Sequence, residues 1–244
     1  MPPPRSTQIF VAVDTVDLAT AAAQTAATDG VIPGIKLGLE FFMAHGPDGV
    51  RAVTSGTRPL FLDLKLHDIP NTVAGAARAV MPLRPTLLTV HAGGGAAMLR
   101  AALDAAGEAS AKAGITRPRI IGVTVLTSLA EADMDAVGQR GPIADQAKRL
   151  AALAKSCGLD GVVCSPHEIA ALRAECGDGF LLVVPGIRPT WAAAGDQKRV
   201  MTPAEAARLG ADCLVIGRPI TAAEDPAAAA RRIAAEVVAA APAA

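Results

Sequence analysis

Eight short apolar runs recur along the chain at a nearly constant spacing, and this pattern constrains the fold more than any other feature. Each run precedes a polar or glycine-rich turn and then an alanine-rich segment of helical character. The ends of the first and last runs lie 203 residues apart over seven steps, or 29 residues per step. A strand–helix unit needs about 30 residues. The runs are Ile9–Asp14, Gly34–Gly38, Leu60–Leu66, Leu87–Ala92, Ile120–Leu126, Gly161–Ser165, Leu181–Gly186 and Cys213–Gly217.

Eight such units without a break in composition predict the α/β class and a single (β/α)8 TIM barrel. The barrel is expected to take up residues 1–244 as one domain, with frayed ends at about 1–7 and 239–244. A first helix is expected over about Asp17–Thr28. Thr202 with Glu205, and Ser165 with Glu168, have the spacing of capping boxes and predict two further helix starts.

Composition excludes several classes of partner. Lys plus Arg balances Asp plus Glu at 23 each, so nothing indicates a nucleic-acid partner. No uncharged apolar run approaches the roughly 20 residues that span a bilayer, and the N-terminus has no apolar leader. We therefore expect no membrane association and a cytoplasmic location. Four cysteines without CxxC spacing are interpreted as reduced core thiols: Cys157, Cys164, Cys176 and Cys213.

The third run carries charged residues, which are unusual in a buried strand. Leucines at 62, 64 and 66 alternate with Phe61, Asp63 and Lys65, so an acid and a base share one face of the strand. Asp68 follows just after the strand end. Burying charges is costly even when they are paired, so this placement indicates a functional site.

A second lysine is expected to join this group. Lys36 is the central residue of the neighbouring run and lies between Gly34 and Gly38 on its face, which leaves room for a long charged side chain. If Lys36, Asp63, Lys65 and Asp68 alternate in space, the lysines stay protonated and the acids ionised. Lys65 would then act as a proton donor, and the alternative interpretation is a structural ion-pair network.

The last two runs predict a phosphate site. Pro185-Gly186-Ile187-Arg188-Pro189 follows the seventh run, and Gly217-Arg218 ends the eighth. Loops after these two strands commonly bind phosphate in this fold. Glycine lets backbone N–H groups approach the anion, and arginine offers a bidentate fork.

Other polar residues near the strand ends are less decisive. His91 ends the fourth run on the inner face, where a catalytic role and a packing role are both open. Trp191 could cover the site or lie on the surface. His67 is expected to support the loop, and His45 and His167 to be structural or surface residues. The histidines and cysteines lack metal-ligand spacing, so no metal site is predicted.

The segment Phe61–Val73, FLDLKLHDIPNTV, resembles the signature of the orotidine 5′-phosphate decarboxylase family. Other blocks resemble that family in the same order over about residues 8–222: VAVD at 11–14, IKLG at 35–38, LTS at 126–128, PGIRP at 185–189, DQ at 196–197 and IGRPI at 216–220. The resemblance implies a homodimeric barrel that converts orotidine 5′-phosphate to uridine 5′-phosphate (UMP), the last step of UMP synthesis, without a cofactor.

The resemblance also implies roles for individual residues. Lys65 would protonate C6 of the pyrimidine, in a charged tetrad completed by Lys36, Asp63 and Asp68. Asp68 and Thr72 would enter the site of the partner subunit. The remaining contacts would be Asp14 and Lys36 to the ribose, Thr127 to the base, and Arg188, Gln197, Gly217 and Arg218 to the phosphate.

Two alternatives stay open. Metal-dependent sugar-phosphate decarboxylases, such as those acting on 3-keto-L-gulonate 6-phosphate, share Asp-x-Lys-x-x-Asp in a similar barrel, although Ile69–Val73 favours the nucleotide enzyme. A catalytically silent protein that binds a phosphate ligand is the other alternative. Decarboxylase activity that survives chelation would exclude the metal-dependent enzyme. Any turnover of orotidine 5′-phosphate would exclude the silent binding protein.

Overall fold

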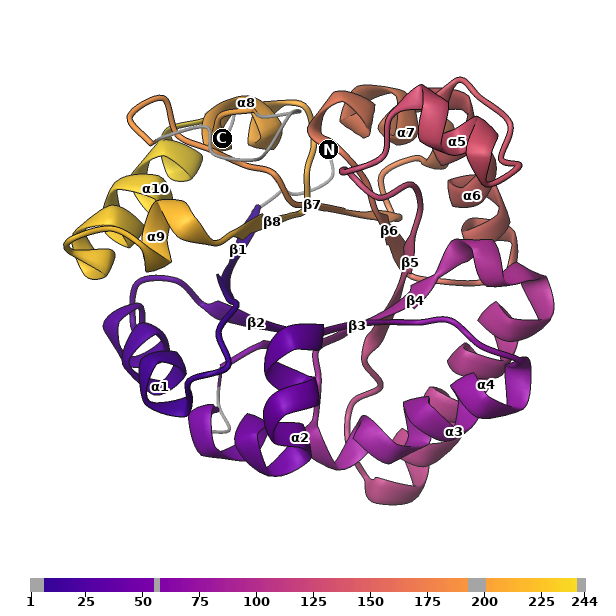
Figure 1. The fold of residues 1–244 in the computed structure, drawn as a ribbon, viewed down its shortest axis with the longest axis horizontal. Coiled ribbons are helices and arrows are strands. Elements are labelled where there is room, and N and C mark those ends of the chain that lie inside the picture. The colour runs from indigo at the N-terminus through magenta and orange to yellow at the C-terminus, as the bar shows by residue number, and fades with distance from the viewer. Residues whose placement is uncertain (1–6, 55–57, 193–200, 241–244) are drawn as a thin grey trace.

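The protein forms a closed barrel of eight parallel strands (Figure 1). The structure, a computed structural model, describes residues 7–54, 58–192 and 201–240. Neighbouring strands follow the chain order, and β8 pairs with β1 to close the barrel. The predicted (β/α)8 barrel is therefore confirmed. Its strands are β1 (Gln8–Val13), β2 (Gly34–Gly38), β3 (Leu60–Leu66), β4 (Leu87–His91), β5 (Arg119–Val123), β6 (Gly161–Val163), β7 (Leu181–Val184) and β8 (Cys213–Ile216).

The helices form a ring outside the strands, as Figure 1 shows. They are α1 (Leu18–Ala27), α2 (Leu39–Val53), α3 (Pro70–Val80), α4 (Gly95–Ala113), α5 (Glu131–Ala136), α6 (Ile143–Ser156), α7 (Ile169–Cys176), α8 (Pro203–Arg208), α9 (Arg218–Thr221) and α10 (Pro226–Ala240). Three short 3-10 turns adjoin them: η1 (Met81–Leu83), η2 (Ala92–Gly94) and η3 (Pro166–Glu168).

Helix starts follow the local chemistry of the sequence. The Asp17 carboxylate caps α1 by accepting a hydrogen bond of 2.7 Å from the Thr20 amide, which satisfies an otherwise unpaired donor of the first turn. The capping box predicted at Thr202 and Glu205 starts α8. The box predicted at Ser165 starts η3, which leads directly into α7.

Two apolar layers separate the inside of the barrel from its outside. The larger layer packs strands against helices. The smaller layer fills the barrel, where Phe10 and Phe61 meet edge to face with ring centroids 5.8 Å apart. A Cβ at Gly34 would lie 2.4 Å from the Phe10 ring, so glycine is needed there. These apolar side chains fill the interior of the barrel beneath the polar residues at the carboxyl ends of the strands.

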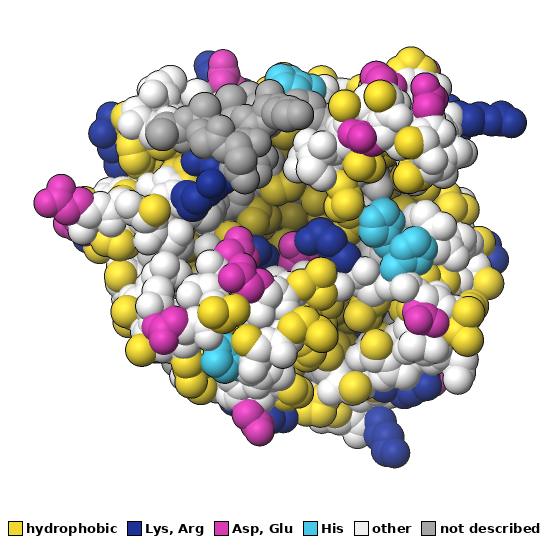
Figure 2. Space-filling view, viewed as in Figure 1, with side chains coloured by type: hydrophobic (Ala, Val, Ile, Leu, Met, Phe, Trp, Pro, Cys, Tyr) yellow, Lys and Arg dark blue, Asp and Glu magenta, His cyan; other side chains and the backbone are white. Residues whose placement is uncertain are grey.

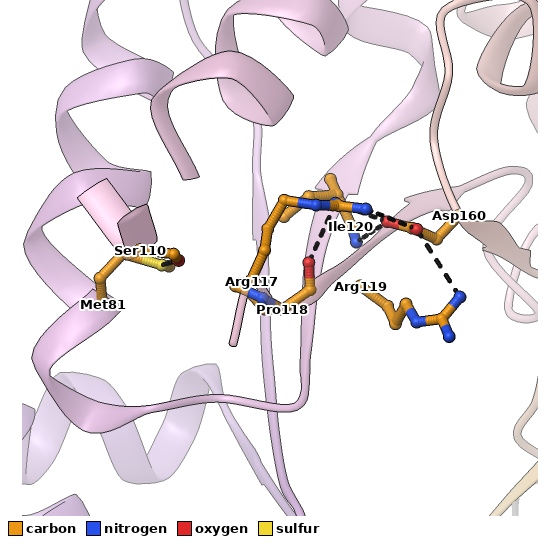
Figure 3. Close-up of polar contacts among 7 residues, drawn as sticks. All are labelled: Met81, Ser110, Arg117, Pro118, Arg119, Ile120 and Asp160. Atoms are coloured by element: carbon orange, nitrogen blue, oxygen red, sulfur yellow. Dashed lines mark hydrogen bonds and ion pairs between the residues drawn. The ribbon is translucent and has the colours of Figure 1, made fainter. Parts of the chain in front are cut away.

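Charged groups also fasten the amino ends of the strands (Figure 3). The Asp160 carboxylate, directly before β6, accepts two hydrogen bonds of 2.8 Å from the Arg117 guanidinium. It also accepts one of 2.8 Å from the Ile120 amide in β5. These contacts connect β5 with β6 at the end of the barrel opposite the predicted site.

Some predicted boundaries need correction. β5 ends at Val123 rather than Leu126, since its register with β4 and β6 stops there. Thr124 still bonds through its amide and hydroxyl to the Val163 carbonyl of β6. The expected frayed ends lie largely outside the described residues. In the described part of these ends, the Thr7 hydroxyl donates a hydrogen bond to the Ala211 carbonyl, and α10 continues to Ala240. No helix among the described residues is long and apolar enough to cross a membrane.

Candidate active site

Two lysine–carboxylate pairs lie at the carboxyl ends of neighbouring strands. The Lys65 ammonium donates a hydrogen bond of 2.7 Å to Asp63, on the same strand. The Lys36 ammonium, almost fully buried, donates one of 2.5 Å to Asp14 at the end of β1. Figure 2 shows basic and acidic side chains meeting in the hollow at the centre of this barrel end. Pairing offsets the desolvation of both ammonium groups.

Small residues make space for these pairs. A Cβ at Gly38 would lie 3.2 Å from the Lys36 ammonium nitrogen and 3.4 Å from an oxygen of Asp14. Glycine at position 38 therefore leaves the space for the Lys36 side chain that the sequence predicts.

The backbone of β3 is irregular at Lys65. Lys65 has a φ of 47°, in the left-handed region that lysine rarely adopts. The pairing of β3 with β4 shifts register between Leu62 and Leu66. This bulge does not break the alternation expected through the strand: Leu64 is buried in the layer between strands and helices, Leu66 packs against that layer, and Lys65 lies beside Asp63. Such bulges are common next to active sites.

A cavity of about 410 Å³ lies beside the two pairs. Its polar side is formed by Asp14, Lys36 and Asp63, and its far side by Arg188, Gly217 and Arg218 from the loops after β7 and β8. Gly186, which has a φ of 76°, lines it as well. The cavity thus runs from the charged pairs to the loops predicted to bind phosphate.

A second cavity, of about 160 Å³, shares Asp63, Pro185 and Val215 with the first. Lys65 and Thr127 line it together with the apolar side chains of Phe61, Val123, Val125, Leu126, Val163 and Val183. A flat apolar group could enter here and place one edge against the Lys65 ammonium. The two cavities together suit a ligand with an apolar ring at one end and an anion at the other.

Comparison with known proteins identifies the family. The model of the "Orotidine 5'-phosphate decarboxylase / HUMPS family" matches residues 7–233. The orotidine 5′-phosphate decarboxylase of Paramagnetospirillum magneticum is 57% identical over 94% of this chain and 97% of its own. The chain belongs to this family.

Two further members support the assignment. The orotidine 5′-phosphate decarboxylase of Rhodospirillum rubrum is 56% identical over 98% of both chains. The crystal structure of orotidine 5′-phosphate decarboxylase from Lactobacillus acidophilus superposes with a TM-score of 0.83 at 38% identity, covering 95% of this chain and 99% of that chain. The similarity therefore extends over the whole barrel.

Three of the residues that the family resemblance singles out lie away from these cavities or outside the described part. Asp68 and Thr72 are exposed, and neither lines the two cavities. Asp68 accepts a hydrogen bond of 2.6 Å from the Ile69 amide of its own chain. Gln197 lies outside the described residues. One chain thus brings together Lys36, Asp63 and Lys65 of the expected tetrad, but not Asp68.

The structure shows the contacts of His91 and Trp191, whose roles the sequence leaves open. His91 stacks on His67, with ring centroids 5.0 Å apart. Burial lowers the pKa of His91, and the nearby His67 and Lys65 lower it further. Trp191 lines neither cavity; its indole donates a hydrogen bond of 3.0 Å to Glu236 in α10. Trp191 therefore anchors the loop after β7 to that helix.

Sequence reasoning missed Thr89, which is completely buried and contacts both Asp63 and Lys65. Its only sequence signal is a polar residue on the same strand face as His91. Among the described residues, no group of three or more His, Cys, Asp or Glu side chains is arranged to hold a metal ion.

Proposed function

We propose that the protein decarboxylates orotidine 5′-phosphate to UMP and that Lys65 protonates C6 of the pyrimidine. The single observation that carries this proposal is the Asp63–Lys65 pair at the point where an apolar cavity and an anion-suited cavity meet. Membership of the family whose members are named for this reaction supports it.

The substrate orientation follows from charge and polarity. The phosphate would bind Arg218, the Gly217 amide and Arg188, with Gln197 as a further contact. The ribose hydroxyls would bind Asp14 and Lys36. The pyrimidine would enter the smaller cavity, where Thr127 can bond to its polar edge. These assignments place the reacting carbon beside the Lys65 ammonium.

The chemistry requires one localised charge to be stabilised. The bond between C6 and the carboxylate breaks, CO2 leaves, and the electron pair stays on C6. A fixed ammonium stabilises that carbanion and then gives it a proton, which forms UMP and leaves Lys65 neutral until solvent returns a proton. Asp63 holds the ammonium in place. Contacts to the distant phosphate supply binding energy that orients the ring.

A decarboxylation assay with and without chelator tests this function. We expect absorbance of orotidine 5′-phosphate to fall, UMP to form, and the rate to be unchanged by EDTA. No turnover of orotidine 5′-phosphate, together with Mg²⁺-dependent decarboxylation of 3-keto-L-gulonate 6-phosphate, would favour the sugar-phosphate alternative. Binding of UMP without any turnover of orotidine 5′-phosphate would favour the silent binding protein.

We further propose that two copies form a homodimer in which Asp68 and Thr72 complete the site of the partner. Asp68 lies in the loop after β3 and Thr72 in the first turn of α3, and both are exposed. Large apolar side chains are also exposed on the segments that follow β1, β2 and β3, among them Met43 at 79% and Ile69 at 67% exposure, with Val16 and Leu39. Large exposed apolar side chains at one end of the barrel favour a protein interface.

A further inference from the structure

Thr89 lies opposite the irregular part of β3. Leu62 pairs with Leu88, and pairing resumes only at Leu66 with Val90. Thr89 is therefore the one residue of β4 that faces the three-residue interval containing Asp63 and Lys65. The Lys65 amide therefore lies where the regular register between β3 and β4 is interrupted.

The Thr89 hydroxyl makes two hydrogen bonds in this interval. It accepts a hydrogen bond of 2.9 Å from the Lys65 amide. It donates one of 3.0 Å to Oδ1 of Asp63. The other oxygen, Oδ2, accepts the bond of 2.7 Å from the Lys65 ammonium. The three bonds close a ring that holds Lys65 at its backbone and at its charged end.

We propose that Thr89 is a positioning residue that fixes the direction of the Lys65 ammonium; this inference rests on the proposed role of Lys65. A lysine side chain has four flexible carbons, so one bond to Asp63 alone leaves it several conformations. Thr89 limits them in two ways. It holds the strained left-handed backbone from which the side chain starts, and it orients the carboxylate that receives the ammonium.

The side-chain type suits this role. Threonine is β-branched and stiff at χ1, and Thr89 is fully buried, so its hydroxyl has a fixed direction. Valine would keep the shape of the side chain while removing both hydrogen bonds. Serine would keep the hydroxyl. These two replacements separate the hydrogen bonds from the packing.

The test compares kcat, KM and UMP affinity of Thr89→Val and Thr89→Ser with those of the wild-type protein. We expect Thr89→Val to lower kcat by roughly 10- to 100-fold, because a small misplacement of a reacting group has effects of this size. KM and UMP affinity should stay within about threefold, since Thr89 lines neither cavity. Thr89→Ser should keep kcat within about threefold of wild type.

Thr124→Val is the matched control. Thr124 is equally buried and donates its hydroxyl hydrogen bond, of 2.8 Å, to the Val163 carbonyl without contacting Lys65. It should lose thermal stability but keep kcat. Equal kcat for Thr89→Val and wild type would overturn the proposal, as would a kcat loss in Thr124→Val as large as in Thr89→Val.

Two further measurements keep the test decisive. If Thr89→Val does not fold, Thr89→Cys keeps a similar volume with a weak hydrogen-bonding group, and the same loss of kcat is expected. The variant Lys65→Ala separates the proposed role of Lys65 from the proposed role of Thr89. Full activity of Lys65→Ala refutes the role of Lys65 itself, whereas an impaired Lys65→Ala beside a fully active Thr89→Val refutes only the role of Thr89.

Discussion

At the scale of single residues, the candidate site depends on the charged side chains of Lys36, Asp63 and Lys65, and the buried Thr89 hydroxyl contacts two of these residues. Asp63, Lys65 and Lys36 stand out because charged side chains end apolar strands, and the structure brings them to one end of the barrel. Thr89 does not stand out, because a threonine in a strand is ordinary. Its importance depends on a register shift between β3 and β4 that no local pattern shows.

His91 should make the stability of the protein depend on pH. Its pKa is lowered in the folded state, mainly by burial and further by His67 and Lys65. The unfolded chain therefore binds a proton more readily, and stability falls as pH decreases below about 6.5, until the folded pKa is reached.

Urea unfolding of wild type and His91→Gln at pH 7.5 and at pH 5.5 measures this effect. Glutamine does not titrate, so we expect the wild-type protein to lose more of its unfolding free energy on acidification than the variant does. An equal loss in both proteins would show that His91 does not contribute.

At the scale of elements, the ends of strands were the least predictable feature. The apolar run at 120–126 continues past the end of β5, because its last residues turn inward to line a cavity rather than pair with a neighbour. A short sequence repeat precedes two of the strands. Gly158-Leu159-Asp160 precedes β6, and Gly210-Ala211-Asp212 precedes β8. In both places the aspartate accepts a hydrogen bond from an amide of the preceding strand, Ile120 or Leu182, and pairs with an arginine.

Asp160→Asn should reduce stability without reducing activity. The change removes the charge that pairs with Arg117, whose pKa is raised by its hydrogen bonds to Asp160. Because Arg117 is partly exposed, we expect a loss of about 1–2 kcal/mol in unfolding free energy. The midpoint of urea unfolding should fall while kcat stays the same, since Asp160 lies at the opposite end of the barrel. A proportional loss of kcat would mean that this end also influences the site.

At the scale of the whole molecule, the barrel follows from the sequence because its spacing repeats eight times. Eight units of 29 residues leave few other folds in which every apolar run is covered by a helix. The arrangement of two copies could not be predicted in this way. An interface depends on which surface residues lie together, and the exposed Met43 and Ile69 come from different segments of the chain.

Mixing inactive variants tests whether two copies share a site. In a dimer of Lys65→Ala with Asp68→Asn, one of the two sites has an intact Lys65 and receives an intact Asp68. Equimolar chains that exchange at random form mixed dimers half of the time, so we expect about a quarter of wild-type activity. The control mixes Lys65→Ala with Lys36→Ala; both lysines belong to the same chain's barrel, so activity should not return.

The turnover of Lys65→Ala alone, measured before mixing, tests the central claim most directly. The claim is that the Lys65 ammonium protonates C6 during decarboxylation. We predict that kcat for orotidine 5′-phosphate falls at least ~10²-fold, the usual contribution of a positioned proton donor, while the variant stays folded and binds UMP. A folded Lys65→Ala protein with near-wild-type kcat would contradict the claim.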